Sequence, residues 1–289
     1  MRKVEELKKI LTEVKNNEYS IPESVDLDEL IEDMLKNIGH TDSELRDGLI
    51  YKVLANWCEN GVIPTEKVRY IFNTCLGEDY LFLNIGEKDT DSVFTRAFAM
   101  LMIPVAFCTH DETPFLTDAE ISNIKKAVFR YVKQEKDYRG WVDGKGWAHA
   151  IAHAADAIDN IVFVCTERDD FIEIFDAIKE MVSNKDVVYD AGEDERIAGA
   201  VIAAIYQSVC DHEILTSKDI CTWIESFGDM EKEWWNGAMP YDYYLHANRK
   251  NFMKSLYVKL LLDEDFDEHK DDYDEICKCV FDVLGKMFD

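Results

Sequence analysis

Two histidines, an aspartate and an asparagine recur along one stretch of this chain at the spacing of a helical turn. They are His149, His153, Asp156 and Asn160, and most of the residues between them are alanine or isoleucine. On a helix that advances about 100° per residue, the four side chains fall within an arc of roughly 60°. No lysine or glutamate lies among them to make this a solvated face. We therefore expect the four side chains to line the wall of a cleft.

Imidazole and carboxylate groups at this spacing support three interpretations. Histidines one helical turn apart can share a divalent metal, with Asp156 as a third ligand or as a partner that orients an imidazole. Either histidine can act as a general base oriented by Asp156. Both can also be neutral core residues that form hydrogen bonds across a helix interface. The glutamate that a metalloprotease requires is replaced by Ala150, and no Glu-x-x-His di-iron element is present. We assign no catalytic residue, metal ligand or cofactor from this pattern.

Aromatic and amide side chains from two other segments extend the candidate cleft. Trp141 and Trp147 flank the glycine-rich loop 140–146, directly before the histidine run. Glycines allow such a loop to approach a ligand closely, or to form a tight connection that lets the tryptophans pack. Tyr244 and Asn248 lie one turn apart within the polar stripe of a later predicted helix. If both stripes face one cleft, they offer hydrogen-bond donors and acceptors to a small polar ligand.

Helices that position these side chains are predicted along nearly the whole chain. Apolar residues recur every three or four positions over residues 4–14, 26–38, 43–60, 65–76, 91–108, 117–136, 149–164, 169–182, 194–210, 220–227, 244–262 and 273–288. Thr117 and Thr216 begin capping-box patterns. Pro104 is expected to kink or break its helix near the last turn. No convincing alternating β-strand is present.

Arginines embedded in apolar helical runs form a second set of polar residues. Arg46, Arg96 and Arg196 each lie at or just inside a predicted helix start. A charge in such a position requires a partner, so we expect buried ion pairs between neighbouring helices.

The predicted helices favour a repeat architecture. Helix pairs begin near residues 26, 64, 118, 168, 216 and 268, and after the first pair the spacing is roughly 50 residues. The chain is 47% hydrophobic and holds only five prolines, as expected for helices joined by short connections. We predict one all-α domain over residues 1–289, with about six antiparallel hairpins stacked into a right-handed, HEAT-like α-solenoid superhelix. A closed α/α toroid is the alternative.

Charge and cysteine usage exclude several functional classes. The 59 acidic and 32 basic residues leave a formal charge of −27, which repels nucleic acids and anionic membranes. The eight cysteines form no pair of Cys-x-x-Cys motifs, so a structural zinc site has no support. The N-terminus lacks the apolar core of a signal peptide, and no uninterrupted apolar stretch has the length that spans a bilayer. We expect a cytoplasmic protein with reduced thiols that binds neither nucleic acid nor membranes.

Several short blocks together resemble a known family. The blocks are SELRD at 43–47, GEKDTDSVFTRAF at 86–98, EKDYRG at 135–140, GWAHAIAHAAD at 146–156, GEDER at 192–196 and SLY at 255–257. They are similar to the bacterial family of proteins of unknown function DUF2785. The resemblance implies an intracellular helical protein and carries no assigned activity or catalytic residue.

From these observations we predict a non-enzymatic binding or scaffold protein whose cleft takes a small polar ligand or a protein segment. The alternative is a hydrolase, with or without a metal, that uses His149, His153 and Asp156. Imidazoles within about 4 Å of each other and open to a pocket would favour the hydrolase, because metal sharing requires that approach. Imidazoles that are enclosed and bonded to a neighbouring helix would count against it.

Overall fold

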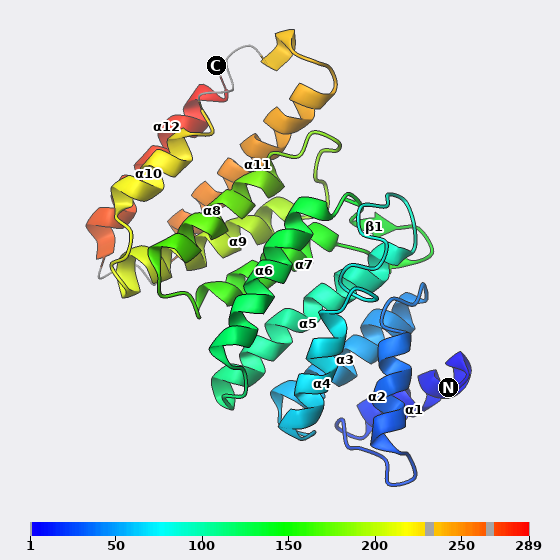
Figure 1. Cartoon of the computed structure of the whole chain (residues 1–289). Helices are drawn as coiled ribbons and strands as arrows, with labels where there is room; N and C mark the ends of the chain where they lie inside the picture. The colour runs from blue at the N-terminus through cyan, green and yellow to red at the C-terminus, as the bar shows by residue number, and fades with distance from the viewer. Residues whose placement is uncertain (1, 229–233, 264–268, 289) are drawn as a thin grey trace. The chain divides into compact units, whose positions relative to one another are not determined.

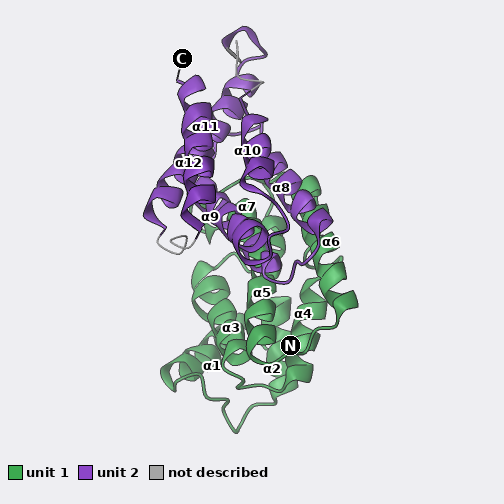
Figure 2. Cartoon of the chain, turned by 90° about the vertical axis from the view of Figure 1, so that its left-hand side faces the viewer, with its two compact units in different colours: residues 1–157 green, residues 158–289 purple. Residues whose placement is uncertain are grey.

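The structure, a computed structural model, describes residues 2–228, 234–263 and 269–288 and confirms an all-α protein (Figure 1). These residues contain twelve α-helices and one pair of two-residue strands. The chain divides into two compact units, residues 1–157 and 158–289, which Figure 2 distinguishes by colour.

Unit 1 is built around the apolar helix α5. In chain order its elements are α1 (Val4–Asn16), α2 (Leu27–Lys36), the π-helix η1 (Glu44–Tyr51), α3 (Lys52–Glu59), α4 (Thr65–Cys75), α5 (Ser92–Glu112), α6 (Asp118–Gln134), β1 (Trp141–Val142), β2 (Gly146–Trp147) and the start of α7 (Ala150–Val162). Helices α3 and α4 both pack against α5, most of whose side chains are buried. Gly39 permits a close approach to this helix, because a Cβ there would lie 2.0 Å from the Thr95 hydroxyl.

Local sequence signals account for several helix ends. Asp26 caps α2 by accepting the backbone N–H of Glu29 at 3.0 Å. Thr117 forms the predicted capping box at the start of α6, in which Glu120 accepts the Thr117 backbone N–H at 2.8 Å. Both signals act within four residues of the helix end, so distant packing does not disturb them.

Pro104 does not end α5, which corrects the predicted boundary near Cys108. The helix continues to Glu112, and Val105, Ala106 and Phe107 are buried beyond the proline. A proline removes one helical hydrogen bond, but the apolar surface that this last segment buries outweighs that loss.

The predicted helix 43–60 forms in two parts with different hydrogen bonding. Residues Glu44–Tyr51 adopt a π-helix that runs directly into α3. The π segment buries Leu45, Arg46, Leu49 and Ile50, and π segments often occur at functional sites. Arg46 is the polar member of this buried set.

Unit 2 follows the predicted elements closely. It contains α8 (Arg168–Val182), α9 (Glu193–Ile205), the π-helix η2 (Tyr206–Asp211), α10 (Ser217–Glu225), the 3-10 turn η3 (Trp234–Asn236), α11 (Tyr241–Leu262) and α12 (Lys270–Lys286). Helix α11 packs against α9 and α12, and α10 packs against α12. Thr216 forms the second predicted capping box, with Asp219 as its partner.

Helix α5 also corrects the expectation about membrane-spanning segments. By length and composition it is the one helix among the described residues that could cross a bilayer. However, 78% of its most apolar window is buried inside the protein, and it carries the fully buried Arg96. A core helix of a soluble protein passes the same test, so the finding is weak evidence for a membrane span.

Candidate functional site

The glycine loop forms a short β-hairpin that holds two exposed tryptophans side by side. Trp141 pairs with Trp147, and Val142 pairs with Gly146 in an antiparallel register. We call residues 141–147 the tryptophan hairpin. The indole rings meet edge to face, with centroids 4.9 Å apart and planes at 80°. Trp141 is 57% exposed and Trp147 38% exposed. The sequence predicted a glycine-rich loop without a strand here, whereas the structure has a two-residue strand pair, because directly opposed aromatic side chains stabilise even a short one.

The fully buried side chain of Arg46 holds the backbone of the tryptophan hairpin in place. One Arg46 nitrogen donates to the carbonyls of Lys145 and Trp147 at 2.7 and 3.0 Å, and the other donates to the His40 carbonyl at 2.6 Å. Gly146 lies against the start of the π-helix η1, which carries Arg46. A Cβ at position 146 would lie 2.7 Å from the Ser43 Cβ.

The prediction that Arg46 forms a buried ion pair was wrong. Its hydrogen-bond partners are backbone carbonyls, and its guanidinium lies over the rings of Phe94 and Phe98, 4.2 and 4.8 Å from their centroids. Burial lowers the pKa of Arg46 to about 10, so the side chain remains cationic at neutral pH. Carbonyl oxygens and aromatic faces thus replace the missing carboxylate.

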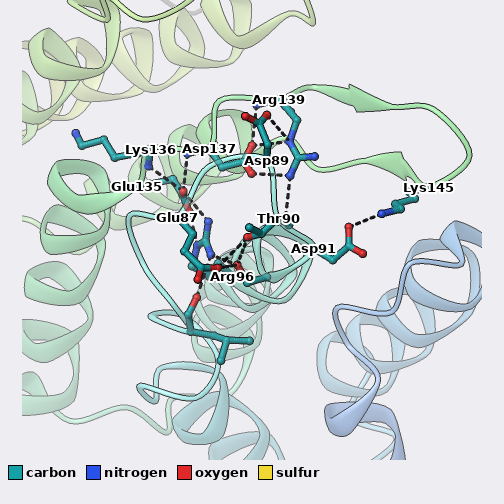
Figure 3. Close-up of polar contacts among 12 residues, drawn as sticks. Glu87, Asp89, Thr90, Asp91, Arg96, Glu135, Lys136, Asp137, Arg139 and Lys145 are labelled. Carbon is teal, nitrogen blue, oxygen red and sulfur yellow. Dashed lines mark hydrogen bonds and ion pairs between the residues drawn. The ribbon is translucent and has the colours of Figure 1, made fainter.

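An ionic network anchors the segment that leads into the tryptophan hairpin (Figure 3). Arg96 and Glu135 form a two-point ion pair, Nε to Oε2 at 2.6 Å and a terminal nitrogen to Oε1 at 2.8 Å. Neither side chain is exposed, which confirms the predicted buried ion pair for Arg96. Glu135 also accepts the backbone N–H groups of Lys136 and Asp137. The carboxylate therefore fixes both the end of α6 and the chain that follows it.

Two further ion pairs connect this network to the tryptophan hairpin (Figure 3). Arg139 pairs with Asp137 at 2.6 Å and donates to the Thr90 carbonyl at 2.7 Å. Lys145, within the hairpin, pairs with Asp91 at 2.6 Å. Arg46 thus holds the hairpin through backbone carbonyls, and Asp91 holds it through the Lys145 side chain.

His149 lies at the entrance of α7 and outside its regular turns. Its φ of 53° is left-handed, and its carbonyl accepts the His153 backbone N–H at 2.9 Å. The ring stacks on Trp147, with centroids 4.1 Å apart and planes at 18°. The helical arc predicted for the four polar residues therefore does not hold for His149, because its backbone leaves the helical region.

His153 is enclosed within unit 1. It is 7% exposed, its Nδ1 lies 3.0 Å from the Ala97 carbonyl on α5, and its ring meets Phe98 edge to face at 5.5 Å. A carbonyl only accepts, so Nδ1 carries the proton of this hydrogen bond. The ring centroids of His149 and His153 are 5.9 Å apart. His153 thus meets the criterion that counts against a hydrolase.

Asp156 and Asn160 are half-buried along α7. Burial is the main cause that raises the pKa of Tyr51 to about 12, and the charges of Glu59 and Asp156 add to it. The tyrosine phenol near Asp156 is therefore neutral at physiological pH. Asn160 lies on the part of α7 that belongs to unit 2.

The candidate residues of α11 lie in unit 2 and have different roles. Asn248 is buried, and its amide accepts from the Tyr189 N–H and donates to the carbonyls of Asn184 and Val187. This side chain joins a loop to α11. Tyr244, one turn earlier, is half-buried.

No metal centre is evident in the described parts of the chain. Within these ranges, no three or more histidine, cysteine, aspartate or glutamate side chains are grouped to hold a metal ion. The tryptophan hairpin offers stacking surfaces, and the adjacent His149 offers an imidazole. The sequence did not predict that Arg46 supports this site, although a charged residue inside an apolar helix was a visible signal.

Comparison with known proteins identifies a family and no individual relative. No curated protein and no solved structure matches the chain. The family of proteins of unknown function DUF2785 matches residues 81–258, which include the tryptophan hairpin, α7 and the Arg96–Glu135 pair. Because this match covers more than half of the 289 residues, the chain belongs to the DUF2785 family.

Proposed function

We propose that this protein binds a ligand non-covalently, and that the tryptophan hairpin is its contact surface. The ligand is a small polar molecule or a protein segment with a face that stacks on indole. One observation carries the proposal: two large aromatic rings are exposed on a backbone that a fully buried arginine holds in place.

Exposure of the two rings favours binding over a purely structural role. Tryptophans that serve only packing bury most of their surface, whereas Trp141 exposes more than half of its own. Aromatic side chains contribute strongly to binding because they offer a large rigid surface with few rotatable bonds. A preorganised surface also loses less conformational entropy on binding. The hydrogen bonds of Arg46 to two hairpin carbonyls supply that preorganisation.

We also propose that the helices continue into the HEAT-like superhelix predicted from the sequence, in one domain within the cytoplasm. Support comes from neighbouring helices that pack together within each unit, such as α3 with α5 and α8 with α9. Tyr244 and Asn160 remain predicted contributors to ligand binding.

A ligand screen that observes the tryptophans directly tests the binding role. Protein labelled with ¹⁵N-tryptophan is titrated with a panel of sugars, nucleosides and amines, and the indole N–H signals are recorded. A true ligand shifts the signals of Trp141 and Trp147, and Trp141→Ala weakens its binding. Trp235, 53% exposed in unit 2, is the matched control, since Trp235→Ala leaves the affinity unchanged. Ligands whose affinity is insensitive to Trp141→Ala would refute the proposal.

A hydrolase remains the second candidate because of His149. This residue is only half-buried, lies beside an exposed indole and precedes a histidine whose Nδ1 donates to a carbonyl. In that case His149 is the general base for attack by water. Turnover of p-nitrophenyl ester or phosphate substrates should then fall at least about 100-fold in His149→Ala. Equal rates in the variant and the wild type would remove this candidate.

A further inference from the structure

If the tryptophan hairpin binds a ligand, as proposed above, its surroundings indicate the charge of that ligand. We propose that the hairpin binds a small organic cation with an alkylated ammonium head group. The geometry of the two indoles, the charges around them and the hydration of possible ligands each support this class.

The two indoles form an aromatic corner of the kind that attracts cations. The two ring planes stand at 80° to each other. A ligand group placed between them can therefore contact both indole rings at once. The face of an aromatic ring carries negative electrostatic potential, and tryptophan attracts cations most strongly among the aromatic residues. Trp141 contributes most of the accessible ring surface, since one face of Trp147 stacks on His149.

Positive side chains near the corner are already engaged. Lys145 pairs with Asp91, Arg139 pairs with Asp137, and Arg46 is buried against carbonyl groups. These contacts leave little positive potential for an anion, and the formal charge of the whole chain is −27.

Negative side chains are present on the hairpin itself and on the helix that contacts it. The turn of the hairpin carries the exposed Asp143. The π-helix η1, which Gly146 meets at Ser43, carries the half-buried Asp47 and the exposed Glu44, which already pairs with Lys8. The charge of the surroundings therefore complements a cation and disfavours phosphorylated or carboxylated ligands.

Hydration distinguishes an alkylated ammonium from other cations. A primary ammonium such as that of lysine is a compact and strongly hydrated charge, which opposes its transfer onto a ring. Alkyl groups spread the charge and give the ligand an apolar surface that matches the indoles. Aromatic recognition of quaternary ammonium groups follows this physical principle.

Choline chloride and its neutral isostere 3,3-dimethylbutan-1-ol provide a matched pair of probes. They have the same shape, with nitrogen replaced by carbon, so a difference in affinity measures the charge. We expect choline to bind roughly fivefold more tightly or better, the factor that corresponds to a cation–π contribution of about 1 kcal/mol. Affinities come from titrations of ¹⁵N-tryptophan protein, with methyl β-glucoside as a neutral ligand that can also stack on indole.

Variants assign the effect to the tryptophan hairpin. Trp141→Ala should lower choline affinity at least about fivefold, and Trp235→Ala should leave it unchanged. Asp143→Asn should weaken choline about twofold and leave the alcohol unaffected, as expected for one exposed charge. Raising NaCl from 50 to 500 mM should weaken choline alone.

The possible failures have different meanings. Binding of the alcohol or the glucoside as tightly as choline, and dependent on Trp141, would overturn the charge of the ligand and retain the binding role. Choline binding that is insensitive to Trp141→Ala would show that the hairpin is not the site. An absence of choline binding would overturn the cation proposal, while the panel of sugars, nucleosides and amines still tests the binding role.

Discussion

Breaking the buried ion pair between Arg96 and Glu135 should cost far more stability than breaking a surface pair of this protein. Replacing Arg96 with methionine leaves the Glu135 carboxylate inside the protein with backbone N–H donors from Lys136 and Asp137 but without its cation. Neither side chain of the pair is exposed, so water cannot replace the lost partner. Breaking a pair of this kind costs about 3–5 kcal/mol of unfolding free energy.

A double mutant separates the interaction from the cost of burial. Glu135→Gln alone should also cost about 3 kcal/mol, because it leaves a buried guanidinium without its carboxylate. In Arg96→Met/Glu135→Gln both charges are absent, and the glutamine oxygen still accepts backbone N–H groups. We therefore expect the double mutant to lose less than the sum of the single losses, with a coupling of about 2 kcal/mol or more.

Equilibrium unfolding in urea, followed by far-UV circular dichroism, measures these free energies. The matched control is the surface pair of Arg130 and Glu78, whose side chains are 42% and 70% exposed. Arg130→Met should cost less than about 1 kcal/mol, and this loss should shrink in 1 M NaCl. Similar costs for Arg96→Met and Arg130→Met, or additive effects in the double mutant, would refute the reasoning.

Three further predictions concern a turn, a helix cap and the thiols. Gly146→Ala should destabilise the protein in urea by about 1 kcal/mol more than Gly144→Ala, because both have positive φ but only position 146 lacks room for a Cβ; equal losses would contradict this. Hydrogen bonds from Arg168 on α8 and from Thr216, the N-cap of α10, lower the pKa of Asp219 from 3.8 to about 2. The stability from this carboxylate is therefore present above pH 4 and lost as the pH falls through 2, so the deficit of Asp219→Asn, about 1 kcal/mol in urea at pH 7, should shrink below pH 4 and be mostly lost at pH 2. Burial raises the pKa of Cys58 to about 12, whereas Cys108 is exposed, so Ellman's reagent should modify Cys108 first at pH 8; equal rates would count against this order.

The fold class and many helix ends could be predicted because their causes are local. The capping boxes at Thr117 and Thr216 each involve residues three positions apart, and both form as expected. The end of α5 could not be predicted from Pro104, because burial of the segment beyond it depends on helices distant in the sequence. Local signals thus identify where helices begin more reliably than where packing lets them end.

The candidate site was predicted in part for the same reason. The sequence draws attention to Trp141 and Trp147, and the structure places them together on one hairpin. Helical periodicity places His149 inside the helix, whereas its left-handed backbone turns it toward Trp147. The Arg46 contact with Lys145 joins residues 99 positions apart, a distance that no periodic pattern reports.

The Arg46 support has a consequence for how this surface can change during evolution. Arg46 holds Lys145 and Trp147 through their main-chain oxygens, which every amino acid possesses. Substitutions at these two positions would alter what the surface recognises, while the hydrogen bonds from Arg46 to the backbone would remain. Descendants of one ancestral chain can in this way acquire new specificities without rebuilding the scaffold.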